Sequence, residues 1–167
     1  MGSTIAGLLI LTLFFTGVLL VSRTTLSGNE QVSAATRDAV QLVGDRARTT
    51  IAVTNTSSSG TCNLSIDVDN TGATSVSDLN RMDVIVQFPT GNNAAQRLDY
   101  VDPGPTTVGE WEFSSISGAF EPGVLNPGET ITIDAQVLVV EAGSGTVTVG
   151  TPNGIIATAA FPSLTAC

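Results

Sequence analysis

The chain has 167 residues, a formal net charge of −9 and no histidine, and its six basic side chains are all arginines. Without imidazoles or lysine amines it lacks the commonest general base, the usual metal-binding ring and the phosphate-binding amine. The acidic balance also disfavours nucleic acid, whose phosphates bind basic surfaces. We therefore expect a protein that is not an enzyme, has no cofactor and binds no nucleic acid.

The first 22 residues are uncharged and mostly apolar, and Arg23 is the first charged side chain. About 20 apolar residues, rising 1.5 Å each, span a hydrocarbon core of about 30 Å. A secretory signal requires a basic flank before its apolar segment, and no such flank is present here. We therefore expect a retained helix. Such a surface must be covered by lipid, detergent or neighbouring copies.

The helical pattern continues to residue 48, with a small, apolar face opposite a charged one. A helix over residues 3–48 has a length of about 70 Å, more than one bilayer crossing needs. The first expected domain is therefore residues 1–48. Its amphipathic half is indicated by residues three or four positions apart: Val32, Thr36, Ala39, Val43 and Ala47.

Small side chains interrupt the apolar segment at Ser3, Ala6, Gly7 and Gly17. Ser3 and Gly7 have the four-residue spacing that lets two helices approach closely. The alternative is a lone membrane anchor with incidental glycines, which are frequent in such helices. Small residues alone do not decide between these interpretations.

From Thr49 the period changes from about 3.6 to 2, and threonine and valine replace leucine and alanine. Residues 49–167 hold Arg81 and Arg97 against twelve carboxylates, and they are numerous enough for one domain with its own core. Short alternating segments separated by Gly, Pro, Asn and Ser indicate an antiparallel Ig-like β-sandwich, so the fold class is α+β. The expected strands are 50–56, 62–69, 83–88, 97–101, 108–113, 129–140, 146–150 and 155–161.

The two cysteines are Cys62 and Cys167. An even number of cysteines outside the cell favours a disulfide, which here closes a loop of about 100 residues. The alternative is two independent thiols.

Asp67, Asp69, Thr71 and Asp78 have part of the spacing of a calcium-binding loop, with Gly72 at the sixth position. The preceding segment has the pattern of a strand instead of a helix, and Asp78 stands where a bidentate glutamate is usual. A weak Ca²⁺ site and an acidic strand end followed by a turn both remain open.

Asn55 and Asn63 each begin an Asn-x-Ser glycosylation pattern. We expect modification of one of them, with Asn55 favoured because the serine-rich stretch beside it should be exposed. The alternative is an ordinary polar strand end.

Glu110 and Glu112 place two carboxylates on one strand face, as glycoside hydrolysis uses. Nothing in the sequence separates their environments, so we favour a solvated pair, with Trp111 and Phe113 in the core.

A leading helix that is apolar and then amphipathic, followed by a β-sandwich, resembles the archaeal type IV pilin-like superfamily, and most closely the archaellins. Ile5 stands where bacterial type IV pilins carry glutamate, and the segments Val68-Asp-Asn-Thr-Gly72 and Leu125-Asn-Pro-Gly-Glu129 look like turns of archaellins and archaellum stator proteins. The resemblance makes Met1-Gly2 look like a processed terminus. The cysteine pair departs from the archaellin pattern.

The resemblance implies a filament subunit that is anchored in the membrane, then extracted to form a helical homopolymer on the cell surface, for motility or adhesion. Export and motor proteins at the filament base are the implied partners. The alternative is a membrane-anchored, archaellum stator-like protein whose sandwich binds the cell envelope. The implied polymerisation helix uses Ser3, Ile5, Ala6, Gly7, Leu9, Phe14 and Gly17.

Overall fold

The computed structural model describes residues 2–59, 61–89 and 95–166. Within the helix it describes the side chains of residues 5, 7–20 and 32–48. The chain forms two compact units, Met1–Val43 and Gly44–Cys167. The last turn of the helix therefore belongs to the unit that holds the sheet.

Helix α1 covers Gly2–Arg48. Leucine and alanine favour this conformation, and the hydroxyls of threonine bond to carbonyls of the preceding turn. Two basic side chains, Arg46 and Arg48, occupy the last turn, where the partial negative charge of the helix terminus favours cations.

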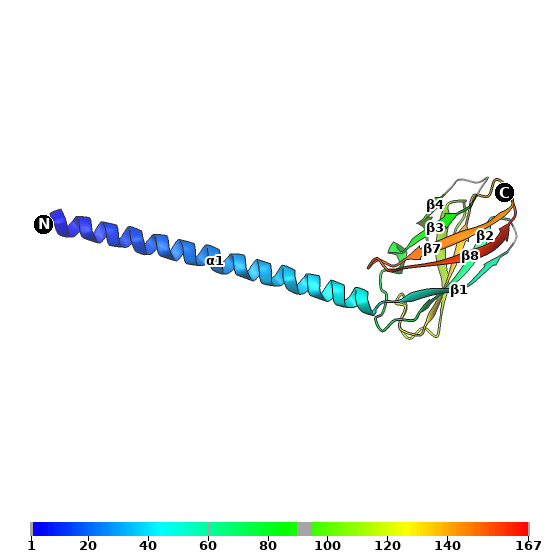
Figure 1. Ribbon diagram of the computed structural model, residues 1–167, viewed down its shortest axis with the longest axis horizontal. Helices are drawn as coiled ribbons and strands as arrows, with labels where there is room; N and C mark the ends of the chain where they lie inside the picture. The colour runs from blue at the N-terminus through cyan, green and yellow to red at the C-terminus, as the bar shows by residue number, and fades with distance from the viewer. Residues whose placement is uncertain (1, 60, 90–94, 167) are drawn as a thin grey trace. The chain divides into compact units, whose positions relative to one another are not determined.

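Eight strands follow and form one curled sheet (Figure 1). Its order is β1-β2-β6-β5-β4-β3-β7-β8. Among the described strands, β4 and β5 pair in parallel, whereas the other pairs are antiparallel. The strands are β1 (Ile51–Ser58), β2 (Asn63–Asn70), β3 (Asp83–Gln87), β4 (Gln96–Tyr100), β5 (Glu110–Ser117), β6 (Thr130–Gln136), β7 (Gly143–Gly150) and β8 (Ile156–Leu164), with a 3-10 turn at Leu79–Arg81.

The two outer strands of this order, β1 and β8, lie next to each other, so the sheet closes on itself as a sandwich. The Thr56 hydroxyl donates to the Ala160 carbonyl at 2.9 Å across this gap. Alternating side chains of the strands fill the interior, and Trp111 is fully buried with its ring edge-to-face against Tyr100 at 5.1 Å. The expected combination of an N-terminal helix and an antiparallel sandwich is confirmed.

Several strand ends differ from the sequence prediction, most of all in β5 and β6. β6 ends at Gln136, whereas the alternation predicted a strand to residue 140, and β5 continues to Ser117 beyond the predicted end at 113. Val137 and Val139 remain fully buried, and the Val137 amide donates to the Cys62 carbonyl at 2.8 Å. Alternating burial therefore outlasts the regular strand, because a side chain can reach the core after ladder pairing has ended.

Candidate functional site

The described part of α1 presents a continuous apolar surface. Among the residues of the implied polymerisation helix, Ile5, Leu9 and Phe14 are 60–70% exposed. Gly7 and Gly17 have no atom within 4 Å of an added Cβ. The side chains of Ser3 and Ala6 lie outside the described residues.

Two polar side chains of this segment have their hydroxyls bonded within the helix. The hydroxyl of Thr12 donates to the Leu9 carbonyl at 2.9 Å, and that of Thr16 donates to the Thr12 carbonyl at 2.8 Å.

Within the part of the chain that the structure describes, no helix is long and apolar enough to cross a membrane. The exposed valines and leucine of the amphipathic half are Val32, Val40, Leu42 and Val43.

The last turn of α1 is hydrogen-bonded to two loops of the sandwich, which we call the helix socket: residues 72–73 after β2 and residues 153–154 between β7 and β8. The amide of Ala73 donates to the Arg48 carbonyl at 2.8 Å, and the amide of Gly72 donates to the Thr50 carbonyl at 2.9 Å. Carbonyls at a helix end lack intrahelical partners. The socket supplies a partner to the last of them.

The second loop of the socket holds the same turn from another side. The Asn153 side-chain amide donates to the Thr49 hydroxyl at 2.7 Å, and that hydroxyl donates to the Asp45 carbonyl at 2.8 Å. The Arg46 guanidinium donates to the Gly154 carbonyl at 3.2 Å. The expected strands 146–150 and 155–161 leave residues 151–154 as a short connection, but nothing in the sequence indicated that it contacts the helix.

A buried asparagine positions the first loop of the socket. Asn70 is fully buried, and its amide donates to the carbonyls of Thr74 and Leu125, both at 2.9 Å. Its side-chain oxygen accepts from the Gly72 amide at 3.1 Å. The Asn-Thr-Gly segment is therefore a structural turn tied to the 118–129 loop.

The candidate calcium residues are used in this same region. Asp67 and Asp69 lie on the outer face of β2, where they accept hydrogen bonds from Thr132 at 2.9 Å and Thr130 at 2.6 Å. The Thr71 hydroxyl donates to the Thr50 carbonyl at 3.3 Å, and Asp78 precedes the 3-10 turn. Within the described residues no three Asp, Glu, Cys or His side chains form a metal-binding group.

A second carboxylate, Glu129, fixes the loop between β5 and β6. It is 6% exposed and accepts hydrogen bonds from the amides of Phe120 and Asn126, both at 2.8 Å. These two hydrogen bonds hold the pKa of Glu129 below its ordinary value, and the one from the Asn126 amide has the larger effect. Phe120 itself projects outward and is 92% exposed.

Glu110 and Glu112 also fix a loop. Glu110 accepts from the amides of Thr106 at 2.8 Å and Thr107 at 2.9 Å, which lower its pKa. Glu112 accepts from the Gly104 amide at 2.6 Å. Each carboxylate thus binds backbone amides of the 104–107 segment, and the pair differs from the solvated pair that the sequence suggested.

The modification candidates lie at accessible places. Asn55 is exposed on β1, where its side chain donates to Asp67 at 3.1 Å, and Asn63 is exposed at the start of β2. Cys62 is buried, and the neighbouring Thr61 forms a parallel bridge with Thr165. Cys167 lies outside the described residues, so its pairing stays a prediction.

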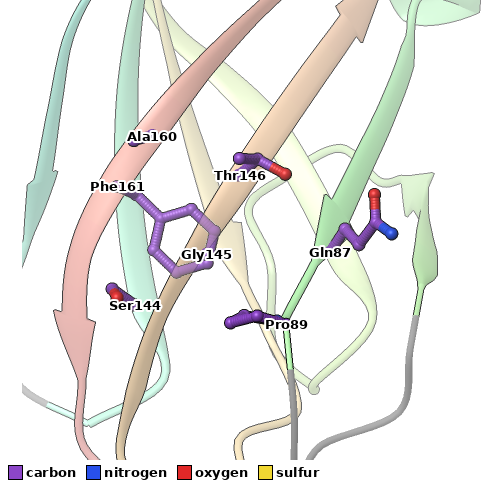
Figure 2. Close-up of a pocket in the computed structure, with 7 residues that line it drawn as sticks. All are labelled: Gln87, Pro89, Ser144, Gly145, Thr146, Ala160 and Phe161. Atoms are coloured by element: carbon purple, nitrogen blue, oxygen red, sulfur yellow. The ribbon is translucent and has the colours of Figure 1, made fainter.

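A hollow of about 350 Å³ is lined by residues of β3, β7 and β8 and by Pro89 after β3. Figure 2 shows the Phe161 ring beside Gly145, with Gln87 at the end of the neighbouring strand β3 and Pro89 just beyond it. A Cβ on Gly145 would meet the Phe161 ring at 2.6 Å and the Gln87 carbonyl oxygen still closer. Glycine is required here because β3 and the ring approach the backbone of β7. No pattern in the sequence indicated this hollow.

The fold class is that of an N-terminal helix followed by an antiparallel β-sandwich. Comparison with known proteins describes this fold more specifically. No family model and no curated protein matches the sequence. Among solved structures, the archaeal flagellum of Methanospirillum hungatei strain JF1 matches 96% of this chain and 93% of its own, with TM-score 0.58 and 12% identity.

Two further structures match a smaller share of the chain. The archaellum periplasmic stator protein FlaG from Sulfolobus acidocaldarius matches 68% of this chain and 99% of its own, at 20% identity and TM-score 0.52. The archaeal flagellin FlaB1 from Methanocaldococcus jannaschii matches 71% and 91%, at 11% identity and TM-score 0.50. The fold is therefore archaellin-like.

Proposed function

We propose that this chain is a structural subunit that polymerises into an extracellular archaellum or pilus filament through its N-terminal helix. The observation that carries the proposal is the match to the archaeal flagellum over 96% of the chain, which extends beyond the sandwich into the helix. The sandwich, with its acidic surface, would form the outside of the filament.

The helix surface supports the same proposal on physical grounds. Large contiguous apolar surfaces are not left in water, and burial contributes roughly 25 cal/mol per Å² of apolar area. The hydroxyls of Thr12 and Thr16 are bonded within the helix, so copies would associate by close packing. Gly7 and Gly17 leave space on one helix for a side chain of the next.

Replacement of these glycines tests the proposal. A Cβ added at Gly7 or Gly17 has no atom of the single chain within 4 Å, so Gly7→Leu and Gly17→Leu should leave the melting temperature of the sandwich unchanged. We expect loss of filaments from sheared cells, imaged by electron microscopy, because leucine occupies the space that a neighbouring helix needs. Leu11→Met, which keeps its volume, is the control. Normal filaments from both leucine variants would contradict the proposal.

The second candidate function is a membrane-anchored, stator-like protein whose sandwich binds the cell envelope. It is favoured by the match to 99% of the stator structure, at the highest identity of the three comparisons. The two functions differ in location, since a filament subunit is released in quantity by shearing whereas a stator stays in the membrane fraction. Imaging the purified full chain for a repeating polymer separates them.

The filament proposal includes the chain's earlier state and its partners. Before assembly, residues 5–21 would hold the subunit in the membrane, and export and motor proteins at the filament base would extract it. We propose no catalytic activity, cofactor or nucleic-acid partner, in keeping with the absence of histidine and lysine. An Ig-like arrangement of the sandwich belongs to the same proposal.

Three modifications of the extracellular part complete the proposal. A disulfide between Cys62 and Cys167 is supported by the bridge between Thr61 and Thr165, which places the chain near each cysteine side by side. Glycosylation is proposed at Asn55, with Asn63 second, since both are exposed. Calcium binding at residues 67–78 remains a weak part of the proposal.

A further inference from the structure

The segment of residues 71–76, between β2 and the 3-10 turn, is hydrogen-bonded to the end of α1 on one side. The Gly72 amide donates to the Thr50 carbonyl at 2.9 Å, and the Ala73 amide donates to the Arg48 carbonyl at 2.8 Å. Carbonyls at a helix end have no partner within the helix, so these bonds fix where the last turn lies on the sandwich.

On its other side the 71–76 segment is bound to the loop between β5 and β6. Val76 and Leu125 are both buried, and they exchange two backbone hydrogen bonds, each at 2.9 Å. The Ser75 hydroxyl donates to the side-chain oxygen of Asn126 at 2.8 Å. The bonds to the helix end and the bonds to the loop therefore lie within five consecutive residues of the chain.

The buried side chain of Asn70 joins the two sides. Its oxygen accepts from the Gly72 amide at 3.1 Å, while its nitrogen donates to the Leu125 carbonyl at 2.9 Å. Because one planar amide group makes both bonds, it cannot turn to follow Leu125 and also keep its bond to Gly72. A buried polar atom without a partner costs free energy, so the two bonds are expected to form and break together.

Glu129 holds the loop in the position that Asn70 requires. One carboxylate oxygen accepts from the Phe120 amide and the other accepts from the Asn126 amide, both at 2.8 Å. The side-chain nitrogen of Asn126 donates to the same carboxylate at 3.3 Å. The carboxylate thus fixes the residue directly after Leu125, whose carbonyl is the partner of Asn70.

We infer that the 71–76 segment couples the loop between β5 and β6 to the last turn of α1. The segment has a docked state, in which the Gly72 and Ala73 amides are bound to the helix end, and a released state, in which those amides are in solvent. While Glu129 holds the loop, the docked state is favoured, and loss of that hold populates the released state. The inference goes beyond the filament function and does not depend on it, because every bond lies within one chain.

Hydrogen exchange of the full chain in detergent, read by mass spectrometry, tests the coupling from the loop. Glu129→Gln replaces one carboxylate oxygen with an NH₂ group, so only one of the two bound amides keeps its acceptor. Peptides covering residues 45–50 and 71–76 should exchange about threefold to tenfold faster. Glu121→Gln, at an exposed position of the same loop, should leave their rates unchanged. Faster exchange confined to residues 119–129 would overturn the inference.

Coupling between two places is reciprocal, so it can also be tested from the helix end. Gly72→Ala places a Cβ against the Arg48 carbonyl oxygen and should speed exchange at residues 119–126 by a similar factor. Gly143→Ala, whose added Cβ meets only an ordinary contact, should not change these rates. Equal rates at residues 119–126 in the wild type and in Gly72→Ala would contradict the coupling.

A general loss of stability gives a different pattern. Ile133→Val removes one methyl group from the core, outside the hydrogen-bond network, and should speed exchange in the strands without a selective effect on residues 45–50. Glu129→Gln should instead leave the amides of β3 and β7 at their wild-type rates. Equal acceleration of all segments by Glu129→Gln would show that the carboxylate supports the fold as a whole, and the coupling would be refuted.

Discussion

Gly72 has no space for a side chain, because the chain passes directly against the end of the helix. A Cβ there would lie 2.5 Å from the Arg48 carbonyl oxygen and closer still to the Thr50 amide nitrogen. Gly72→Ala should therefore destabilise the protein by about 1–3 kcal/mol, the usual cost of overpacking. Chemical denaturation of the full chain in detergent measures this difference.

A second glycine supplies the control for this substitution. Gly143 lies in β7, and the nearest atom to an added Cβ is 3.8 Å away, an ordinary contact. Gly143→Ala should change the free energy of unfolding by less than about 0.5 kcal/mol. Equal losses in the two variants would show that the close approach at Gly72 is not the cause.

Glu129 links the stability of the protein to pH. Its hydrogen bonds from Asn126 and Phe120 favour the carboxylate, so the pKa in the folded chain lies below the ordinary 4.5. This stabilisation is present above pH 4.5 and is lost as the pH falls through the folded pKa. The advantage of the wild type over Glu129→Gln should therefore shrink as the pH falls below 4.5, measured as the denaturation midpoint.

The exposed Glu121 of the same loop is the matched carboxylate. Glu121→Gln should follow the wild type across the same pH range. A difference between wild type and Glu129→Gln that stays constant with pH would contradict the assignment.

At the scale of elements, the strands were predictable because one face of each is buried and alternation records that burial. In β2, for example, Leu64, Ile66 and Val68 are buried and the intervening residues are not. Ends were less predictable, as in β6, where Val137 and Val139 stay buried after the ladder stops. The socket was not predicted, since it joins residues about 25 and 104 positions apart and leaves no local pattern.

The contact between the helix end and the 151–155 turn can be tested by hydrogen exchange. Asn153→Ala removes the donor to the Thr49 hydroxyl, a single bond whose net contribution is about 0.5–1.5 kcal/mol. Amides of residues 45–50 should then exchange about two- to tenfold faster in mass spectrometry. Asn63→Ala, at an exposed position of β2, should leave these rates unchanged. Equal rates in both variants would show that Asn153 does not hold the helix end.

At the scale of the whole molecule, the proposed disulfide would join the start of β2 to the last residue. For a loop of about 100 residues, the entropic model gives up to about 4.7 kcal/mol of stabilisation. With both cysteines paired, the chain should not react with iodoacetamide when it is unfolded without reductant. Reduction should lower the melting temperature of the folded chain. In Cys62→Ser, reductant should have no effect on melting. Two alkylated thiols in the unreduced wild type would contradict the pairing.

The parts of the site differ in how far the sequence reveals them. The apolar helix is predictable because its surface is a property of consecutive residues. The hollow is formed by β3, β7 and β8, and the hydrogen bonds of Glu110 and Glu129 depend on loop conformations. Such arrangements depend on tertiary contacts. The sequence therefore indicated that Glu110 and Glu112 lie on one strand face, but not which backbone amides their carboxylates bind.

The bonded helix end has a consequence for proteolysis. Junctions between a helix and a folded domain are common sites of nicking, because cleavage needs a locally unfolded stretch of chain. Here the Arg48 carbonyl accepts from Ala73, and Arg46 is bound to Gly154. Arg37 lies in the other unit. Brief trypsin treatment should therefore cut after Arg37 before it cuts after Arg48, and Gly72→Ala should abolish this order. The intact masses of the fragments identify the site, and early cutting after Arg48 in the wild type would mean that the junction is open.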